Sequence, residues 1–180
     1  MKPIRVVPIG RADPRLLDAA SRALARAFRT SCATIEANLD PAFAHHPERN
    51  QYHSTAIIEQ LAKRNGDGTV IIGITPLDLY IPILTFVFGE AQLGGSCAVV
   101  SYHRLHQQFY GLPADELLLT ERLEKEAVHE AGHVAGLTHC DDYECVMASS
   151  HAVEWLDLKG LAMCSVCSAV AGLRSHAVAQ

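Results

Sequence analysis

The most informative segment of the chain spans residues 129–139 and reads HEAGHVAGLTH. Apolar residues at helical spacing precede it, so we expect a long helix from Asp115 to about Leu137. On such a helix, His129 and His133 lie four residues apart and share one face. Their ring nitrogens can therefore reach the same metal ion.

The rest of this segment supplies the other parts of an open metal site. Glu130 lies about 100° around the helix from His129, where its carboxylate can hold a water molecule instead of acting as a ligand. Gly136 can adopt a left-handed conformation that ends the helix, and the returning chain can deliver His139 as a third ligand. Three protein ligands with one open position are typical of a catalytic zinc site. The first two histidines alone could occupy an ordinary helix surface, but Gly136 and His139 at these spacings favour zinc.

Met147 lies eight residues after His139. An isolated methionine is usually a core filler. After three zinc-binding histidines it indicates a Met-turn, in which an apolar thioether packs beneath the rings without competing for the metal.

Four of the six cysteines form two close pairs, Cys140-x4-Cys145 and Cys164-x2-Cys167. Thiolates from two such pairs can close a tetrahedral zinc site, which is structural because no position stays open. Two local disulfides or free thiols are the alternative, which a reducing compartment disfavours. Cys140 follows His139 directly and Cys145 precedes Met147 by two residues, so this site would support the loop beside the catalytic ion.

Composition and charge exclude several classes of protein. The 180 residues are 49% hydrophobic, which suits one domain with a folded core. The formal net charge is −5 and the basic residues are scattered, so we expect no nucleic-acid partner. The longest apolar stretch is too short to span a membrane, and the N-terminus lacks the apolar region of a secretion signal. We expect a cytoplasmic monomer with no membrane contact.

Strand and helix patterns alternate along the rest of the chain. Strands are expected at residues 4–9, 33–37, 69–75, 84–88 and 98–102, and helices at residues 14–29 and 51–64. Asp13 and Pro14 supply an N-cap and a first-turn proline, residues 40–50 form a loop, and residues 65–68 form a turn. This order predicts an α/β (α+β) fold with a mixed, twisted sheet and packed helices.

The chain from His129 to Met147 resembles, residue for residue, the motif of the archaemetzincins, a family in the metzincin clan of zinc peptidases. The spacer before the last cysteine pair, residues 148–163, is one residue shorter than in the family's pattern. Looser similarity covers most of residues 49–167, and its segments are Arg49-x-Gln51-Tyr52, Gly73–Tyr80, Phe86–Gly89, Val100–Leu105 and Asp157-x-Lys159.

The resemblance implies one metzincin-like metallopeptidase domain over residues 1–180. Residues 1–138 would form an N-terminal subdomain with the sheet and the active-site helix. Residues 139–180 would form a Cys-rich C-terminal subdomain with the Met-turn and the four-cysteine site. Peptides would bind extended along an edge strand of the sheet, for which residues 96–101 are the candidate.

The expected function is hydrolysis of peptide bonds in a peptide or protein substrate. A catalytic zinc ion would lower the pKa of its water from about 15.7 to about 7, and Glu130 would act as the general base. Two zinc ions are expected, the catalytic one on His129, His133 and His139 and the structural one on Cys140, Cys145, Cys164 and Cys167. Met147 and Gly136 would support the catalytic site.

Two other functions are compatible with the same motif. A catalytically silent zinc-binding domain with a structural or protein-recognition role would carry the same ligands and the same glutamate. A zinc-finger-like interaction module would require the cysteine set to act independently of the histidines.

Overall fold

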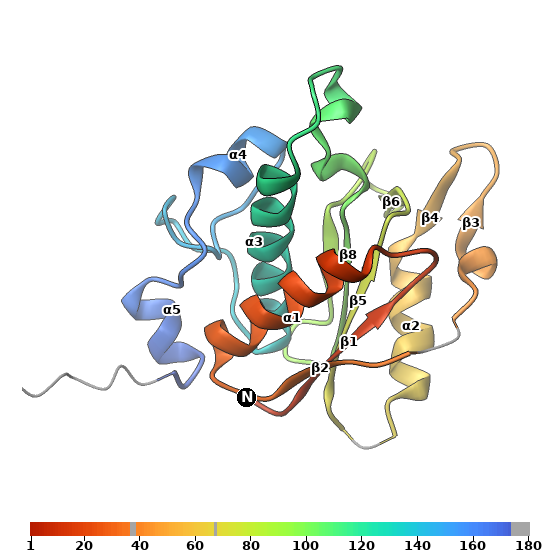
Figure 1. The fold of residues 1–180 in the computed structure, drawn as a ribbon. Helices are drawn as coiled ribbons and strands as arrows, with labels where there is room; N and C mark the ends of the chain where they lie inside the picture. The colour runs from red at the N-terminus through yellow and green to blue at the C-terminus, as the bar shows by residue number, and fades with distance from the viewer. Residues whose placement is uncertain (37–38, 67, 174–180) are drawn as a thin grey trace, which may run out of the picture.

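The main sheet has five strands: β1 (Ile4–Pro8), β2 (Cys32–Thr34), β5 (Val70–Thr75), β7 (Gly89–Ala91) and β8 (Cys97–Ser101). The computed structural model describes residues 1–36, 39–66 and 68–173. In it the strand order is β2-β1-β5-β8-β7 (Figure 1). The first four strands in this order are parallel, and β7 is antiparallel to β8. The sheet is therefore mixed, as predicted.

A smaller sheet stands beside the main one (Figure 1) and consists of β3 (His45–His46), β4 (Gln51–His53) and β6 (Leu79–Tyr80). Its strands β3 and β4 are antiparallel, and β4 and β6 are parallel. The helix predicted at residues 51–64 therefore starts three residues late, at Ser54. Residues 51–53 extend as a strand because Tyr52 N–H donates to the Asp78 carbonyl at 2.8 Å.

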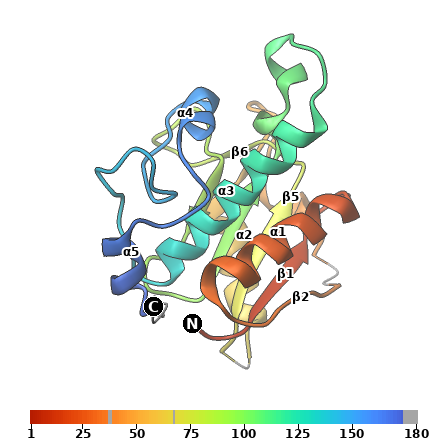
Figure 2. The same ribbon diagram turned by 60° about the vertical axis from the view of Figure 1, so that its left-hand side comes forward.

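Helices cover both faces of the main sheet. The described residues form α1 (Pro14–Phe28), α2 (Ser54–Arg64), α3 (Glu116–Val134), α4 (Val153–Leu158) and α5 (Ser165–Val170), with 3-10 turns at Pro41–Ala44, His103–Leu105 and Gln107–Tyr110. Helices α1 and α3 pack on one face and α2 on the other (Figures 1 and 2). Along β5, Ile72 and Ile74 join the core beneath α1 and α3, whereas Ile71 joins the core beneath α2. Burial on both faces explains the continuous apolar runs of β5 and β8.

The C-terminal part of the chain packs against α3. Helices α4 and α5 lie on the side of α3 that faces away from α2 (Figures 1 and 2). Val146, Met147, Val153 and Leu156 are buried in the same core cluster as the apolar face of α3. This packing holds the segment after His139 close to the helix that carries the other two histidines.

Two strand predictions near the cleft are wrong. Residues 84–88 form no strand beyond an isolated bridge between Val87 and Leu79. The Arg49 guanidinium donates to the carbonyls of Leu84 (2.9 Å) and Thr85 (3.0 Å) instead. The stretch 96–101 is not the edge strand, since β8 lies between β5 and β7. Its side chains are buried on both faces, as an interior strand requires, and the edge is β7 instead.

Most other elements agree with the sequence prediction. Helix α1 begins after Asp13, whose carboxylate accepts a hydrogen bond from Arg15 N–H at 2.8 Å. The strand predicted at residues 33–37 corresponds to β2; Ala37, and Asp67 of the predicted turn, lie outside the described residues. No helix in the described ranges combines the length and the hydropathy that crossing a membrane would need.

Gly73 in β5 provides a test of this packing. An added Cβ would lie 2.6 Å from Ile9 Cδ1 and 3.1 Å from Leu61 Cδ1, closer than carbon atoms pack. We expect Gly73→Ala to lower the free energy of unfolding by about 1–3 kcal/mol, measured by urea denaturation. Gly66→Ala is the control, because its Cβ would meet no atom within 4 Å; equal losses in the two variants would contradict the packing.

Candidate active site

Helix α3 ends in a way that returns the chain to its own face. Its last turn closes with hydrogen bonds from Gly136 N–H to the His133 carbonyl (2.9 Å) and from Leu137 N–H to the Gly132 carbonyl (3.0 Å). Gly136 has φ 91°, the left-handed conformation that this helix ending needs. The chain then reverses and brings His139 beside the two histidines of α3.

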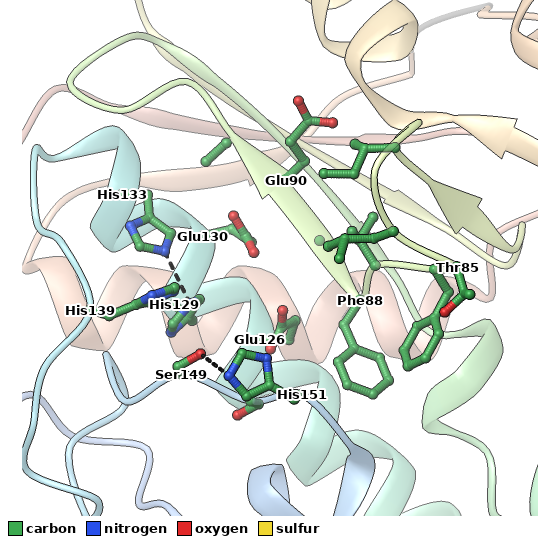
Figure 3. Close-up of a pocket in the computed structure, with 17 residues that line it drawn as sticks. Thr85, Phe88, Glu90, Glu126, His129, Glu130, His133, His139, Ser149 and His151 are labelled. Carbon is green, nitrogen blue, oxygen red and sulfur yellow. Dashed lines mark hydrogen bonds between the residues drawn. The ribbon is translucent and has the colours of Figure 1, made fainter.

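The three predicted histidines converge in the structure (Figure 3). Their ligand atoms lie within 4.8 Å of one another, and the Nε2 atoms of His129 and His133 are 3.1 Å apart. Two nitrogens bound tetrahedrally to one zinc ion, at zinc–nitrogen distances of about 2.0–2.1 Å, would lie about 3.3 Å apart. The donor set and its spacing therefore fit a zinc ion.

Backbone carbonyls select the tautomer of both helix histidines. Nδ1 of His129 lies 2.9 Å from the Val146 carbonyl oxygen, and Nδ1 of His133 lies 2.8 Å from that of Leu137. A carbonyl oxygen can only accept, so each Nδ1 carries the proton and each Nε2 presents a lone pair. Orientation of ligating imidazoles by such partners is a common feature of zinc sites.

The electrostatic surroundings keep these rings neutral. Burial lowers the pKa of His133 and of His139. Burial and the charge of Lys159 lower the pKa of His129 well below its usual value. Neutral imidazole is the form that binds a metal ion.

Glu130 is buried beside the histidines, against strand β7. A Cβ at Gly89 would lie 2.6 Å from Glu130 Cγ and 2.7 Å from its Oε1, so only glycine leaves room for this carboxylate. Burial raises the pKa of Glu130 well above its usual value, and the charge of Glu126 adds to the rise. The site thus holds a carboxyl group that binds a proton more tightly than a surface glutamate does.

Met147 packs against α3 behind the histidines. Its side chain is fully buried, and a Cβ at Gly132 would overlap its sulfur atom and lie 3.0 Å from its Cε. The backbone of this segment is also fixed, because Cys140 N–H donates to the Met147 carbonyl at 3.0 Å. The segment that carries Met147 therefore lies close to both His129 and the first cysteine.

The four predicted cysteines form a second cluster, whose Sγ atoms lie within 4.8 Å of one another. All four are free thiols, and Sγ of Cys140 is 3.9 Å from that of Cys164. Thiolates on a tetrahedral zinc ion, at about 2.3 Å from it, lie about 3.8 Å apart. The backbone N–H of Cys167 lowers the pKa of Cys164 to about 7, which favours its thiolate. Burial raises the pKa of Cys145 and of Cys167, so their thiolates would depend on the charge of a bound metal ion.

A cavity of about 460 Å³ opens onto the histidines (Figure 3). Its lining comes from β7, from α3 and from two segments: residues 81–88 on one side and residues 149–151 on the other. Figure 3 shows Glu126 between Phe88 and His151, and the carboxylate of Glu90 turned away from the histidines. Strand β7, the last strand of the sheet, contributes Gly89, Glu90 and Ala91 to this lining.

A network of polar contacts holds the wall formed by residues 81–88. Arg104 makes two contacts of 2.7 Å with the Asp78 carboxylate, and its guanidinium lies 4.3 Å from the centre of the Phe86 ring. Gln51 bridges Asp78 and the Thr85 carbonyl. These residues belong to the upstream segments of the sequence resemblance, so the structure gives those segments a role in shaping the cavity.

Sequence reasoning missed Glu126, which lies one turn before Glu130 on the same face of α3. The spacing of four residues could have revealed it. Lys159 is also buried nearby, and its Nζ lies 3.1 Å from the Ala148 carbonyl oxygen and 3.4 Å from His129 Nδ1. The polar face of α3 therefore extends beyond the predicted motif.

The turn between β7 and β8 is attached to α3. Gly94 N–H donates to the His133 carbonyl at 2.9 Å, the same carbonyl that accepts from Gly136. The β7–β8 hairpin and the helix that carries His133 are thereby joined at the C-terminal end of that helix.

Known proteins resemble this chain over most of its length. The archaemetzincin of Methanocaldococcus jannaschii is 36% identical over 164 residues, which cover 91% of this chain and 89% of that protein. The crystal structure of a zinc-dependent peptidase from Methanocorpusculum labreanum superimposes with a TM-score of 0.84 at 30% identity, covering 93% of this chain and 99% of that one. The archaemetzincin structure from Methanopyrus kandleri gives a TM-score of 0.84 at 32% identity, and the match covers 95% of this chain and 93% of that one.

This combination of a mixed sheet, a long helix with paired histidines and a cavity beside them is that of a zinc metallopeptidase. The family model of peptidase family M54 matches residues 38–171. The chain belongs to this family, the archaemetzincins, as its motif suggested.

The contact between Gly132 and Met147 can be tested by stability. In an ordinary helix, Gly→Ala stabilises by about 1 kcal/mol. Because a Cβ at Gly132 would overlap Met147, we expect Gly132→Ala to lower the free energy of unfolding of the zinc-loaded protein by about 1–3 kcal/mol. The double variant Gly132→Ala/Met147→Ala should lose less than the sum of the single variants. A gain in stability from Gly132→Ala would contradict the contact.

Proposed function

We propose that the chain hydrolyses peptide bonds with Glu130 as general base, in a site where His129, His133 and His139 hold the catalytic zinc ion. The convergence of three neutral imidazoles beside a buried carboxyl group carries this proposal. Bound zinc supplies a Lewis acid that acidifies a water molecule and polarises a carbonyl group.

Glu130 carries out the proton transfers. Its carboxylate takes a proton from the attacking water and returns it to the nitrogen of the leaving amine. A pKa raised by burial brings this group closer to the neutral range, in which a carboxyl group both accepts and releases a proton efficiently. Because Gly89 has no side chain, the Glu130 carboxylate can occupy the space beside it.

The substrate is a peptide or protein segment bound in extended form along β7. This edge strand lines the cavity, and main-chain hydrogen bonds to an edge strand are a general mode of peptide binding. The wall at residues 81–88 faces the segment after Met147 across the cavity, so an extended chain would lie between them.

The four cysteines hold a second, structural zinc ion. Four thiolates complete a tetrahedral site and leave no position for water or substrate. Met147 forms a Met-turn that supports the histidine rings from below. Because Cys140 follows His139 directly, the structural ion would limit the movement of the third catalytic ligand.

The whole of residues 1–180 acts as one metallopeptidase domain, with residues 1–138 and 139–180 as its subdomains. Support comes from the core cluster that joins α3 to Met147 and Leu156 across this boundary. The chain works as a cytoplasmic monomer without nucleic-acid or membrane partners. The net charge of −5 supports the absence of a nucleic-acid partner, since such partners require clustered cations.

Glu130→Gln tests the general base. Gln cannot accept the proton, so we expect peptide hydrolysis to fall by about 10²–10⁴-fold, whereas zinc content and melting temperature stay close to those of the unmodified protein. Hydrolysis is measured on peptide pools with and without a zinc chelator. Glu59→Gln, an exposed carboxylate on α2, is the control. Substantial turnover by Glu130→Gln would remove Glu130 from this role.

Cys164→Ser tests the structural zinc site. We expect the variant to lose one zinc ion per chain by elemental analysis, and to unfold at lower denaturant concentration, because the metal binds only the folded chain. Its catalytic site should also release zinc to a chelator faster. Cys32→Ser, outside the cluster, should retain both ions; unchanged zinc content in Cys164→Ser would contradict the site.

A further inference from the structure

Glu126 is a buried carboxyl group that the hydrolytic mechanism does not use. It lies on α3 one turn before Glu130, is 4% exposed, and lines the cavity. Its Oε2 is shielded from solvent and has no hydrogen-bond partner among the described residues. A buried polar atom left without a donor costs free energy, so its presence in a cavity suggests that a ligand supplies the donor.

The charges around Glu126 favour a cationic donor. The lining residues of the cavity include three glutamates, whereas no lysine or arginine occurs among the described lining residues. Burial raises the pKa of Glu126, and the charge of Lys159 opposes this rise only in part, since the Lys159 ammonium group donates to the Ala148 carbonyl. It therefore acts on Glu126 from a distance and leaves Oε2 unpaired.

Glu90, the third glutamate, is already satisfied. Its carboxylate accepts hydrogen bonds from the hydroxyl groups of Ser54 (2.5 Å) and Thr55 (2.8 Å) at the start of α2. It also points away from the histidines (Figure 3). Glu130 has the role of general base, and its carboxyl group interacts with that of Glu126. Oε2 of Glu126 nevertheless remains without a hydrogen-bond partner among the described residues.

The walls beside Glu126 suit a chain that ends in a positive charge. Phe86 and Phe88 pack edge to face, with ring centres 5.2 Å apart, and they line the cavity together with residues 149–151. An aliphatic stem can pack along aromatic side chains while its charged end reaches a carboxylate. The polar backbone of an extended peptide would remain on β7.

We propose that Glu126 is a specificity-determining residue, forming the acidic end of a substrate subsite that binds a cationic group of the peptide. This inference rests on the proposed function, since it assumes a peptide in the cavity. The cation is either a lysine or arginine side chain or the N-terminal ammonium group. A charge-assisted hydrogen bond to the Glu126 carboxylate would stabilise the complex by more than a neutral contact does.

Peptide binding is measured on a variant that cannot hydrolyse the peptide, so the test of this inference does not depend on the hydrolytic mechanism. The zinc-loaded Glu130→Gln protein is titrated with peptides in which lysine or norleucine, its uncharged counterpart, occupies one position at a time. Each peptide is used with a free and with an acetylated N-terminus. We expect the lysine peptide at one position, or the free N-terminus, to bind about tenfold more tightly or better than its neutral partner.

Glu126→Gln in the same background should reduce this preference to less than about twofold. Glu126→Asp keeps the charge and should retain part of the preference, which distinguishes loss of the carboxylate from loss of the fold. Glu90→Gln is the matched control and should keep the full preference. Equal binding of charged and neutral peptides, or a preference that survives Glu126→Gln, would overturn the inference, whether or not the unmodified protein hydrolyses peptides.

Discussion

The site depends on two hydrogen bonds from imidazole rings to backbone carbonyls. Nδ1 of His129 donates to Val146, and Nδ1 of His133 donates to Leu137. These bonds turn both rings toward one site, where the two Nε2 atoms lie 3.1 Å apart. Two such acceptors cannot satisfy each other, and their close approach fits a cation bound between them. The rest of the molecule keeps the helix and the following loop in the positions that these bonds need.

The two candidate metal sites share one short loop. It begins at His139, passes through Cys140 and Cys145, and ends at Met147, whose carbonyl accepts from Cys140 N–H. The carbonyl that orients His129 belongs to Val146 in the same loop. The four-thiol cluster and the histidine trio are therefore consecutive parts of one structure, and disorder in one would be transmitted to the other.

The sequence predicted those parts of the site that depend on local spacing. His129 and His133 were expected on one helix face, and Gly136 was expected to turn the chain toward His139. The wrong strand at residues 84–88 has a different origin, because Arg49, far away in the chain, captures the carbonyls of that segment. The interior place of β8 likewise follows from pairing with β7, which no local pattern encodes.

Glu126 illustrates the same limit at the site itself. A helix-period pattern places it near Glu130, but its burial and the direction of the nearby Lys159 ammonium group, which donates to the Ala148 carbonyl, depend on segments distant in the sequence. The sequence shows which residues carry chemistry, and the tertiary structure shows which of them remain unsatisfied.

The bond from Gly94 to the His133 carbonyl has a mechanical consequence. It ties the β7–β8 hairpin to the end of α3, so it restrains the separation between β7 and the imidazole rings before any peptide arrives. A peptide bound along β7, as proposed above, would therefore have to fit its own conformation to a separation that the protein already restrains.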